Sequence, residues 1–284
     1  MDAQSTCLYM DSMPAVSAIY YALLQNGYDF YALGRPAEHA AAIRRFAGSH
    51  VAQPFFAEAR QNTCEVYPYW PRAALMETAA LYLSTDLSTW VDYDALKRNV
   101  MAATNLMEQE RNQAFWQWIE KFPSELQAVL NSPAFTAYMH WERSWLDAQR
   151  TKHAEEMGHI AEILRLCAER YGSSVRQVRV VLNPIKCVYS SDYELLNDCL
   201  IVCSGAFQAE SIVHEYLHHI LYPIVKIYKE ALESNPREYP DLDDSYQQAG
   251  ALYAFEEYAV RQLTQLALAR KLPEDINAYI GSII

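Results

Sequence analysis

Two histidines four residues apart, with a glutamate directly after the first, have the spacing in this chain best suited to chemistry. They are His214, Glu215 and His218, in the run His-Glu-Tyr-Leu-His. On an α-helix this spacing places both imidazoles on one face, one turn apart, where they can bind one metal ion. Zinc (Zn²⁺) suits two neutral imidazoles and one carboxylate, with a fourth position open for water, and Glu215 can accept the proton of that water. The motif therefore predicts a zinc site capable of hydrolysis.

The residues around the motif favour a metal over a purely structural role. They are mostly aliphatic and predict a buried helix from about Gln208 to Leu221. Two histidines and a glutamate in such a helix are costly unless something satisfies their polar groups. The alternative is that these side chains cap a core or pair with one another without an ion.

A third protein ligand has to be a carboxylate, because no histidine follows His219 and no cysteine follows Cys203. Glu256 and Glu257 lie in the middle of an apolar helix predicted from about Asp244 to Lys271. Adjacent helical residues point about 100° apart. We therefore expect one of the two glutamates to face solvent and the other to bind the ion.

The helical register favours Glu257 over Glu256 as the third ligand. Glu257 shares a mixed polar face with Tyr253 and Arg261, whereas the face of Glu256 is more apolar. An apolar face can also hide a ligand, so the choice of Glu256 stays open. Tyr253, one turn before Glu257, is the candidate to stabilise an oxyanion. The alternative is a packing role, since the chain has 21 tyrosines.

Two strands are predicted before the motif helix. Residues 178–182 alternate in character and predict a strand that Asn183-Pro184 ends. Residues 198–203 predict a second strand, closed by Ser204-Gly205. After the helix, the prolines and aspartates of residues 235–244 predict a loop.

The chain before these strands predicts mostly helix, from residue 13 to about 172. Its longest amphipathic stretches run from about 93 to 121 and from about 133 to 171, and Gly172 has the position of a C-terminal cap. The predicted fold class is α+β and predominantly helical, with a helical N-terminal domain (1–172) and a catalytic domain with a small sheet (173–284). We expect the helical half to pack over the active site and to shape substrate entry.

The second half resembles the gluzincin class of zinc metallopeptidases, in particular little-characterised bacterial members. The resemblance covers about residues 176–265. It rests on a strand ending in Asn-Pro, a second strand ending near Gly205, the HExxH helix, and Glu257 followed four residues later by Arg261. It implies a zincin-like catalytic half that cleaves a peptide or protein substrate, with Glu215 as general base. This pattern also favours Glu257 as the third ligand.

The resemblance implies how the rest of the site is built. His214, His218 and the downstream glutamate would hold zinc. An antiparallel edge strand above the site would bind the extended substrate by β-augmentation. Residues 198–204 are the expected edge strand.

Two departures from the gluzincin pattern bear on the site. Glu257 follows His218 by 39 residues, a longer interval than in compact gluzincins, which the loop at 235–244 can absorb. Arg261 stands where some gluzincins place an aspartate that orients a histidine. We expect Arg261 to hold a neighbouring carboxylate or the second oxygen of the ligand, which leaves the partner that orients the histidine unassigned.

A rival interpretation is a di-iron carboxylate protein, which needs two Glu-x-x-His helices and two further glutamates. Glu156 with His159 and Glu215 with His218 have this spacing, and Glu142 and Glu257 could supply the rest. Strand-like residues between the two motifs and the charged surroundings of Glu156 argue against it. A third interpretation is a zinc-bearing but inactive binding module, against which the intact Glu215 argues.

Charge and cysteine usage limit the partners and the compartment. The formal net charge of −12 makes nucleic acid an unfavourable partner. The six cysteines form no CxxC pair, the first residues lack a basic signal-peptide region, and no segment offers the roughly 20 apolar residues that span a membrane. The sequence therefore predicts a cytoplasmic protein without a membrane partner.

Overall fold

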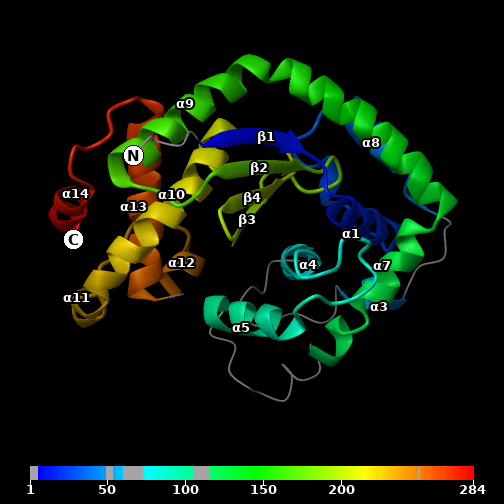
Figure 1. The fold of residues 1–284 in the computed structure, drawn as a ribbon, viewed down its shortest axis with the longest axis horizontal. Helices are drawn as coiled ribbons and strands as arrows, with labels where there is room; N and C mark the ends of the chain where they lie inside the picture. Colours follow the sequence, from blue (N-terminus) through cyan, green and yellow to red (C-terminus); the bar gives the residue numbers. More distant parts are fainter. Residues whose placement is uncertain (1–5, 49–53, 60–72, 105–115, 249) are drawn as a thin grey trace.

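Helices surround a central four-stranded sheet in the computed structural model of this chain (Figure 1). The structure describes residues 6–48, 54–59, 73–104, 116–248 and 250–284. The middle of the helix predicted from 93 to 121 lies outside these ranges. The mostly helical α+β class predicted from the sequence is confirmed.

The sheet has the order β1-β2-β4-β3. Its strands are β1 (Cys7–Asp11), β2 (Gln177–Leu182), β3 (Ser191–Leu196) and β4 (Cys199–Ser204). Strands β1, β2 and β4 are parallel, and β3 runs antiparallel to β4. The pairing of Leu196 with Cys199 leaves a two-residue hairpin turn, in which Asn197 has a positive φ of 57°.

The predicted identity of the edge strand is wrong. Residues 198–204 were expected at the edge, but β4 lies inside the sheet, between β2 and β3. The antiparallel edge strand is β3, which the sequence did not indicate. The difference arises because the chain turns back at Asn197 and pairs β3 along the outer side of β4.

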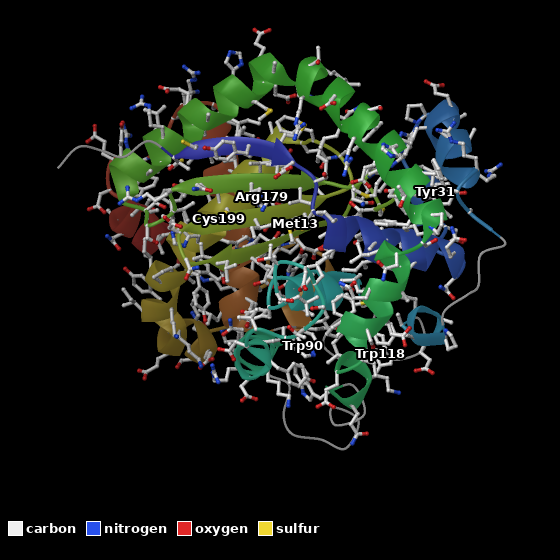
Figure 2. The ribbon with its side chains drawn as sticks, turned by 45° about the vertical axis from the view of Figure 1, so that its right-hand side comes forward. Met13, Tyr31, Trp90, Trp118, Arg179 and Cys199 are labelled. Carbon is white, nitrogen blue, oxygen red and sulfur yellow. The ribbon has the colours of Figure 1, made fainter. Side chains whose placement is uncertain are left out.

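Each face of the sheet is covered by a separate apolar core. Val178 and Val180 face a core that also contains buried residues of the long helices after residue 145. Val181 and Ile201 face a core built by the N-terminal helices. In Figure 2, Arg179 of β2 and Cys199 of β4 mark the sheet, and Trp118 marks the helical part.

The N-terminal helices form the core on one face. They are α1 (Pro14–Gln25), α2 (Ala37–Arg44), α3 (Pro54–Glu58), α4 (Ala73–Ala80), α5 (Tyr93–Thr104) and α7 (Phe122–Leu130), with a 3-10 turn at Phe30–Ala32. Helix α1 is buried nearly throughout and packs against α4 and α7. Its first residue is a proline, whose fixed φ suits the start of a helix.

Two long helices, α8 (Pro133–Lys152) and α9 (Ala154–Tyr171), run one after the other past β1 as an arch (Figure 1). They correspond to the single stretch predicted from 133 to 171, which is interrupted at His153. The predicted end is confirmed, since Gly172 caps α9 with a φ of 78° that favours glycine.

The remaining helices follow the sheet. They are α10 (Ala209–Val225), a 3-10 turn (Lys226–Tyr228), α11 (Lys229–Ser234), α12 (Asp244–Gln248), α13 (Ala251–Leu268) and α14 (Ile276–Ile283). The single helix predicted from 244 to 271 is therefore two, α12 and α13.

The two sides of residue 172 share the sheet and contribute residues to both cores. Strand β1 pairs with β2, and α9 packs against α10. The division into two domains, residues 1–172 and 173–284, stays a prediction. Among the described residues no helix is both long enough and apolar enough to span a membrane.

Glu142 of α8 is expected to make stability fall as pH rises. Its side chain is fully buried, Ser17 Oγ donates a hydrogen bond to Oε1 at 2.6 Å, and burial raises the pKa from 4.5 to about 7. Between those pH values the folded protein holds a proton that the unfolded chain has lost. The contribution of Glu142 to the free energy of unfolding should therefore decrease by up to about 3 kcal/mol across this window and stay level above it.

Glu142→Gln tests this prediction by urea denaturation at pH 5 and pH 8. The amide keeps the shape without the charge, so the variant should gain stability relative to the wild type at pH 8 and little at pH 5. Glu155→Gln, at an exposed carboxyl of α9, is the matched control. Equal pH dependence in the wild type and Glu142→Gln would contradict the assignment.

Candidate metal centre

Helix α10 presents the motif on the side of the helix that faces α13. Its apolar residues, among them Val213, Leu217 and Leu221, are buried in the core beneath the sheet. The helix begins shortly after Gly205, where a Cβ atom would collide with the carbonyl groups of Lys186 and Cys187. This close approach needs glycine and fixes the entry of the chain into α10.

Helix α13 supplies the carboxylates and packs along α10. Gly250 precedes its first residue with a φ of 114°, a conformation that favours glycine. Glu256 and Glu257 are both only 5% exposed. The expectation that one of the two faces solvent is wrong, because both reach the histidines of α10.

Three potential ligand atoms converge on one point. His214 Nε2 and His218 Nε2 are 3.1 Å apart, and each lies 3.5 Å from Glu257 Oε2. Zinc bonds of 2.0–2.1 Å in a tetrahedron separate the ligand atoms by about 3.3 Å. The three atoms therefore have the spacing of one face of a zinc tetrahedron, and their chemistry fits that ion.

The other polar atoms of two of these side chains, His218 Nδ1 and Glu257 Oε1, are held by further contacts. His218 Nδ1 lies 2.8 Å from Glu256 Oε1, and Arg261 Nε donates to Glu257 Oε1 at 2.7 Å. A carboxylate on Nδ1 fixes the imidazole so that Nε2 is free for a metal. Glu256 thus has the position of the histidine-orienting partner that the sequence left unassigned, and Arg261 holds the second oxygen of Glu257.

Glu215 also lies close to the histidines. The potential ligand atoms of His214, Glu215 and His218 are all within 4.8 Å of one another. Proximity alone would admit Glu215 as a ligand in place of Glu257. We favour Glu257, because the same oxygen of Glu257 is equidistant from both Nε2 atoms while Arg261 fixes the other oxygen.

The charges of the site favour a cation at the point of convergence. Burial lowers the pKa of His218, but hydrogen bonds to Glu256 and Glu257 outweigh it and raise that pKa to about 10. Burial alone would raise the pKa of Glu257, yet its hydrogen bonds with the two histidines hold it well below the usual range. Burial raises the pKa of Glu215 to about 8. A positive ion beside Glu215 would favour its carboxylate form.

Two tyrosines flank the site. The ring of Tyr193, on β3, stacks on His218 with centroids 5.6 Å apart and an interplanar angle of 11°. No sequence pattern indicated Tyr193, although Asn197 is a residue type that tolerates the positive φ of a tight turn. Tyr253 lies on α13 with 36% of its surface exposed, and its proposed oxyanion role stays a prediction.

The structure brings only part of the di-iron set together, since Glu215, His218 and Glu257 lie at the site whereas Glu142 and Glu156 do not. Glu142 bonds to Ser17 in the other core, and Glu156 pairs with His153 at 2.8 Å on the surface of α9. Within the described ranges, His214, Glu215 and His218 have potential ligand atoms within 4.8 Å of one another, and neither Glu142 nor Glu156 belongs to that group.

Comparison with known proteins identifies no relative. The chain has no significant match to a protein-family model, a curated protein or a solved structure. The functional argument therefore rests on the residues of the site.

The third ligand can be tested by comparing Glu257→Ala with Glu256→Ala. Glu257→Ala should weaken zinc binding more, because it removes an atom that contacts the ion. Glu256→Ala should cost about 10–100-fold in affinity, the usual effect of removing a carboxylate that orients a histidine ligand. Competition with a chromogenic chelator measures both. A larger loss of zinc affinity in Glu256→Ala than in Glu257→Ala would show that Glu256, and not Glu257, is the third ligand.

Proposed function

We propose that this protein is a zinc-dependent hydrolase, and specifically a metallopeptidase of gluzincin type. The observation that carries the proposal is the convergence of His214 Nε2, His218 Nε2 and Glu257 Oε2, with Glu215 beside them on the same helix. Three protein ligands leave one position for water, which is the arrangement of catalytic rather than structural zinc.

The residues of the site divide the chemistry between them. Zinc, when bound, polarises a carbonyl group and acidifies water. Glu215 accepts a proton from the attacking water at its carboxylate and passes it to the leaving amine. Glu256 keeps His218 in the tautomer that presents Nε2, and Arg261 keeps one oxygen of Glu257 turned away from the ion. Tyr253 is the proposed oxyanion stabiliser.

A peptide substrate is favoured by the position of β3. This strand has β4 as its neighbour on one side and ends the described sheet on the other. It contacts α10, and Tyr193 of β3 lies against His218. An extended peptide could pair with the outer side of β3 and bring a peptide bond to the site. An edge strand beside an HExxH helix also supports a zincin-like arrangement.

The decisive experiment is a cleavage profile of the zinc-loaded protein on an unbiased peptide library. We expect cleavage that a chelator removes and that added zinc restores. Stoichiometric zinc with no cleavage of any peptide would instead favour a zinc-bearing binding module.

A further inference from the structure

Alternate side chains of β3 point in opposite directions. Tyr193 lies against His218. Asp192 and Glu194 point to the other side, where Asp192 Oδ2 accepts from Lys186 Nζ in the loop after β2 and Glu194 accepts a hydrogen bond from Thr78 of α4. Strand β3 is thus held from behind by this loop and α4 and faces the candidate metal centre in front.

The contact with Lys186 belongs to a buried charged cluster. Lys186 Nζ lies 2.9 and 3.0 Å from the two carboxylate oxygens of Glu77 on α4, besides its bond to Asp192. The exposed fractions are 1% for the Lys186 side chain, 4% for Glu77 and 21% for Asp192. We call these three residues the β3 anchor.

A gain in the stability of the folded protein does not by itself explain such a buried charged cluster. Removing charges from water is costly, and buried ion pairs can often be replaced by uncharged residues without loss of stability. Beside the anchor, the cavity between α4 and β3 measures only about 10 Å³, room for about one water. Directional bonds in such a confined space fix the position of the groups that make them.

The anchor lies one residue away from the candidate site. Asp192 is the chain neighbour of Tyr193, so a shift of Asp192 would move the ring that stacks on His218. On its other side, the loop that carries Lys186 is fixed by Arg35, whose Nη2 donates to the carbonyl oxygens of Lys186 at 2.9 Å and of Asn183 at 3.3 Å. The anchor therefore joins a rigid loop, α4 and β3.

We propose that Lys186, through Glu77 and Asp192, is a positioning residue that sets the edge strand β3 and Tyr193 against the metal centre so that substrate can bind. The proposal rests on the proposed peptidase function for its catalytic part. The fixing of β3 by the anchor does not depend on that function.

The test uses a variant in which the anchor loses its charges together. Lys186→Met alone leaves the buried Glu77 and the partly buried Asp192 without their cation and would disturb folding. The triple variant Lys186→Met/Glu77→Gln/Asp192→Asn keeps similar side-chain volumes. The matched control is Asp11→Asn, which breaks the ion pair of Asp11 with Arg179 at the opposite edge of the sheet.

Three measurements are made on each full-length protein: zinc stoichiometry, hydrogen exchange of the β3 amides that bond to β4, and kcat and KM on the best library peptide. In the triple variant we expect unchanged zinc, β3 exchange faster by about tenfold or more, and kcat/KM lower by about tenfold or more, mainly through KM. The control should match the wild type in all three.

Each result decides a separate point. If the β3 amides of the triple variant exchange at the wild-type rate, or exchange is equally faster in the Asp11→Asn control, the β3 anchor does not fix the strand. Faster β3 exchange with unchanged KM would overturn its positioning role. If the wild type cleaves no peptide, the proposed function fails, and the exchange measurement still decides whether the anchor fixes β3.

Discussion

Glu215→Gln should keep the zinc and lose hydrolysis. The amide has nearly the same shape as the carboxylate, so the histidines on either side keep their positions. It cannot accept the proton of water, and loss of a general base usually lowers the rate by about 10²–10⁴-fold. The measurement is kcat on the best library peptide, with zinc content determined on the same sample.

Glu210→Gln is the matched control for this variant. Glu210 lies on the same helix, in its first turn, where its carboxylate accepts a hydrogen bond from Gln265 at 2.7 Å. It should retain the wild-type rate. If Glu215→Gln cleaves the peptide as fast as the wild type, Glu215 is not the base and the mechanism is wrong.

The second large effect is expected from His214→Ala and His218→Ala. Each removes one imidazole and leaves the ion with two protein ligands, so each should weaken zinc binding by more than about 100-fold, beyond the usual cost of an orienting group. Elemental analysis of the purified proteins should find about one zinc per chain in the wild type and little in either variant.

His219→Ala provides the control for the histidine variants. His219 is half-buried on the same helix, near the ring of Tyr216 rather than at the point of convergence. Its loss should leave the zinc content unchanged. Two irons per chain in the wild type, or unchanged zinc in both His214→Ala and His218→Ala, would contradict the proposed metal centre.

The sequence predicted helix α10, which carries the candidate metal centre, because the information for this helix is local. Spacing along one helix determines that His214 and His218 share a face, and the aliphatic residues around them determine which face is buried. Strands β2 and β4 and the end of α9 at Gly172 were predicted on similar local grounds. No partner distant in the sequence is needed for these inferences.

The roles of Glu256 and Glu257 could not be separated from one helix alone. Helical register separates the two carboxylates only if both have to reach the same atom. An imidazole offers two nitrogens on different sides of its ring, and the two glutamates reach different nitrogens of His218. The packing of α13 against α10 decides this, and helical periodicity does not describe it.

Strand β3 was missed because its buried face is partly polar. Asp192 and Glu194 point inwards to Lys186 and Thr78, whereas Tyr193 and Leu195 are about 40% exposed. A pattern that assigns apolar residues to the inside gives the opposite orientation for this strand. The partners that make the polar face favourable lie outside the strand, and Thr78 is more than 100 residues away.

The parallel pairing of β1 with β2 has a consequence for the synthesis of the chain. Cys7 and its partner Gln177 are separated by 170 residues. At translation rates of about 5–20 residues per second, β1 would leave the ribosome roughly 9–34 s before its partner strand. Throughout that time the helices between them can form, but β1 has an unpaired backbone. A nascent chain arrested before residue 182 would therefore carry β1 as an exposed segment available to chaperones or to misassembly.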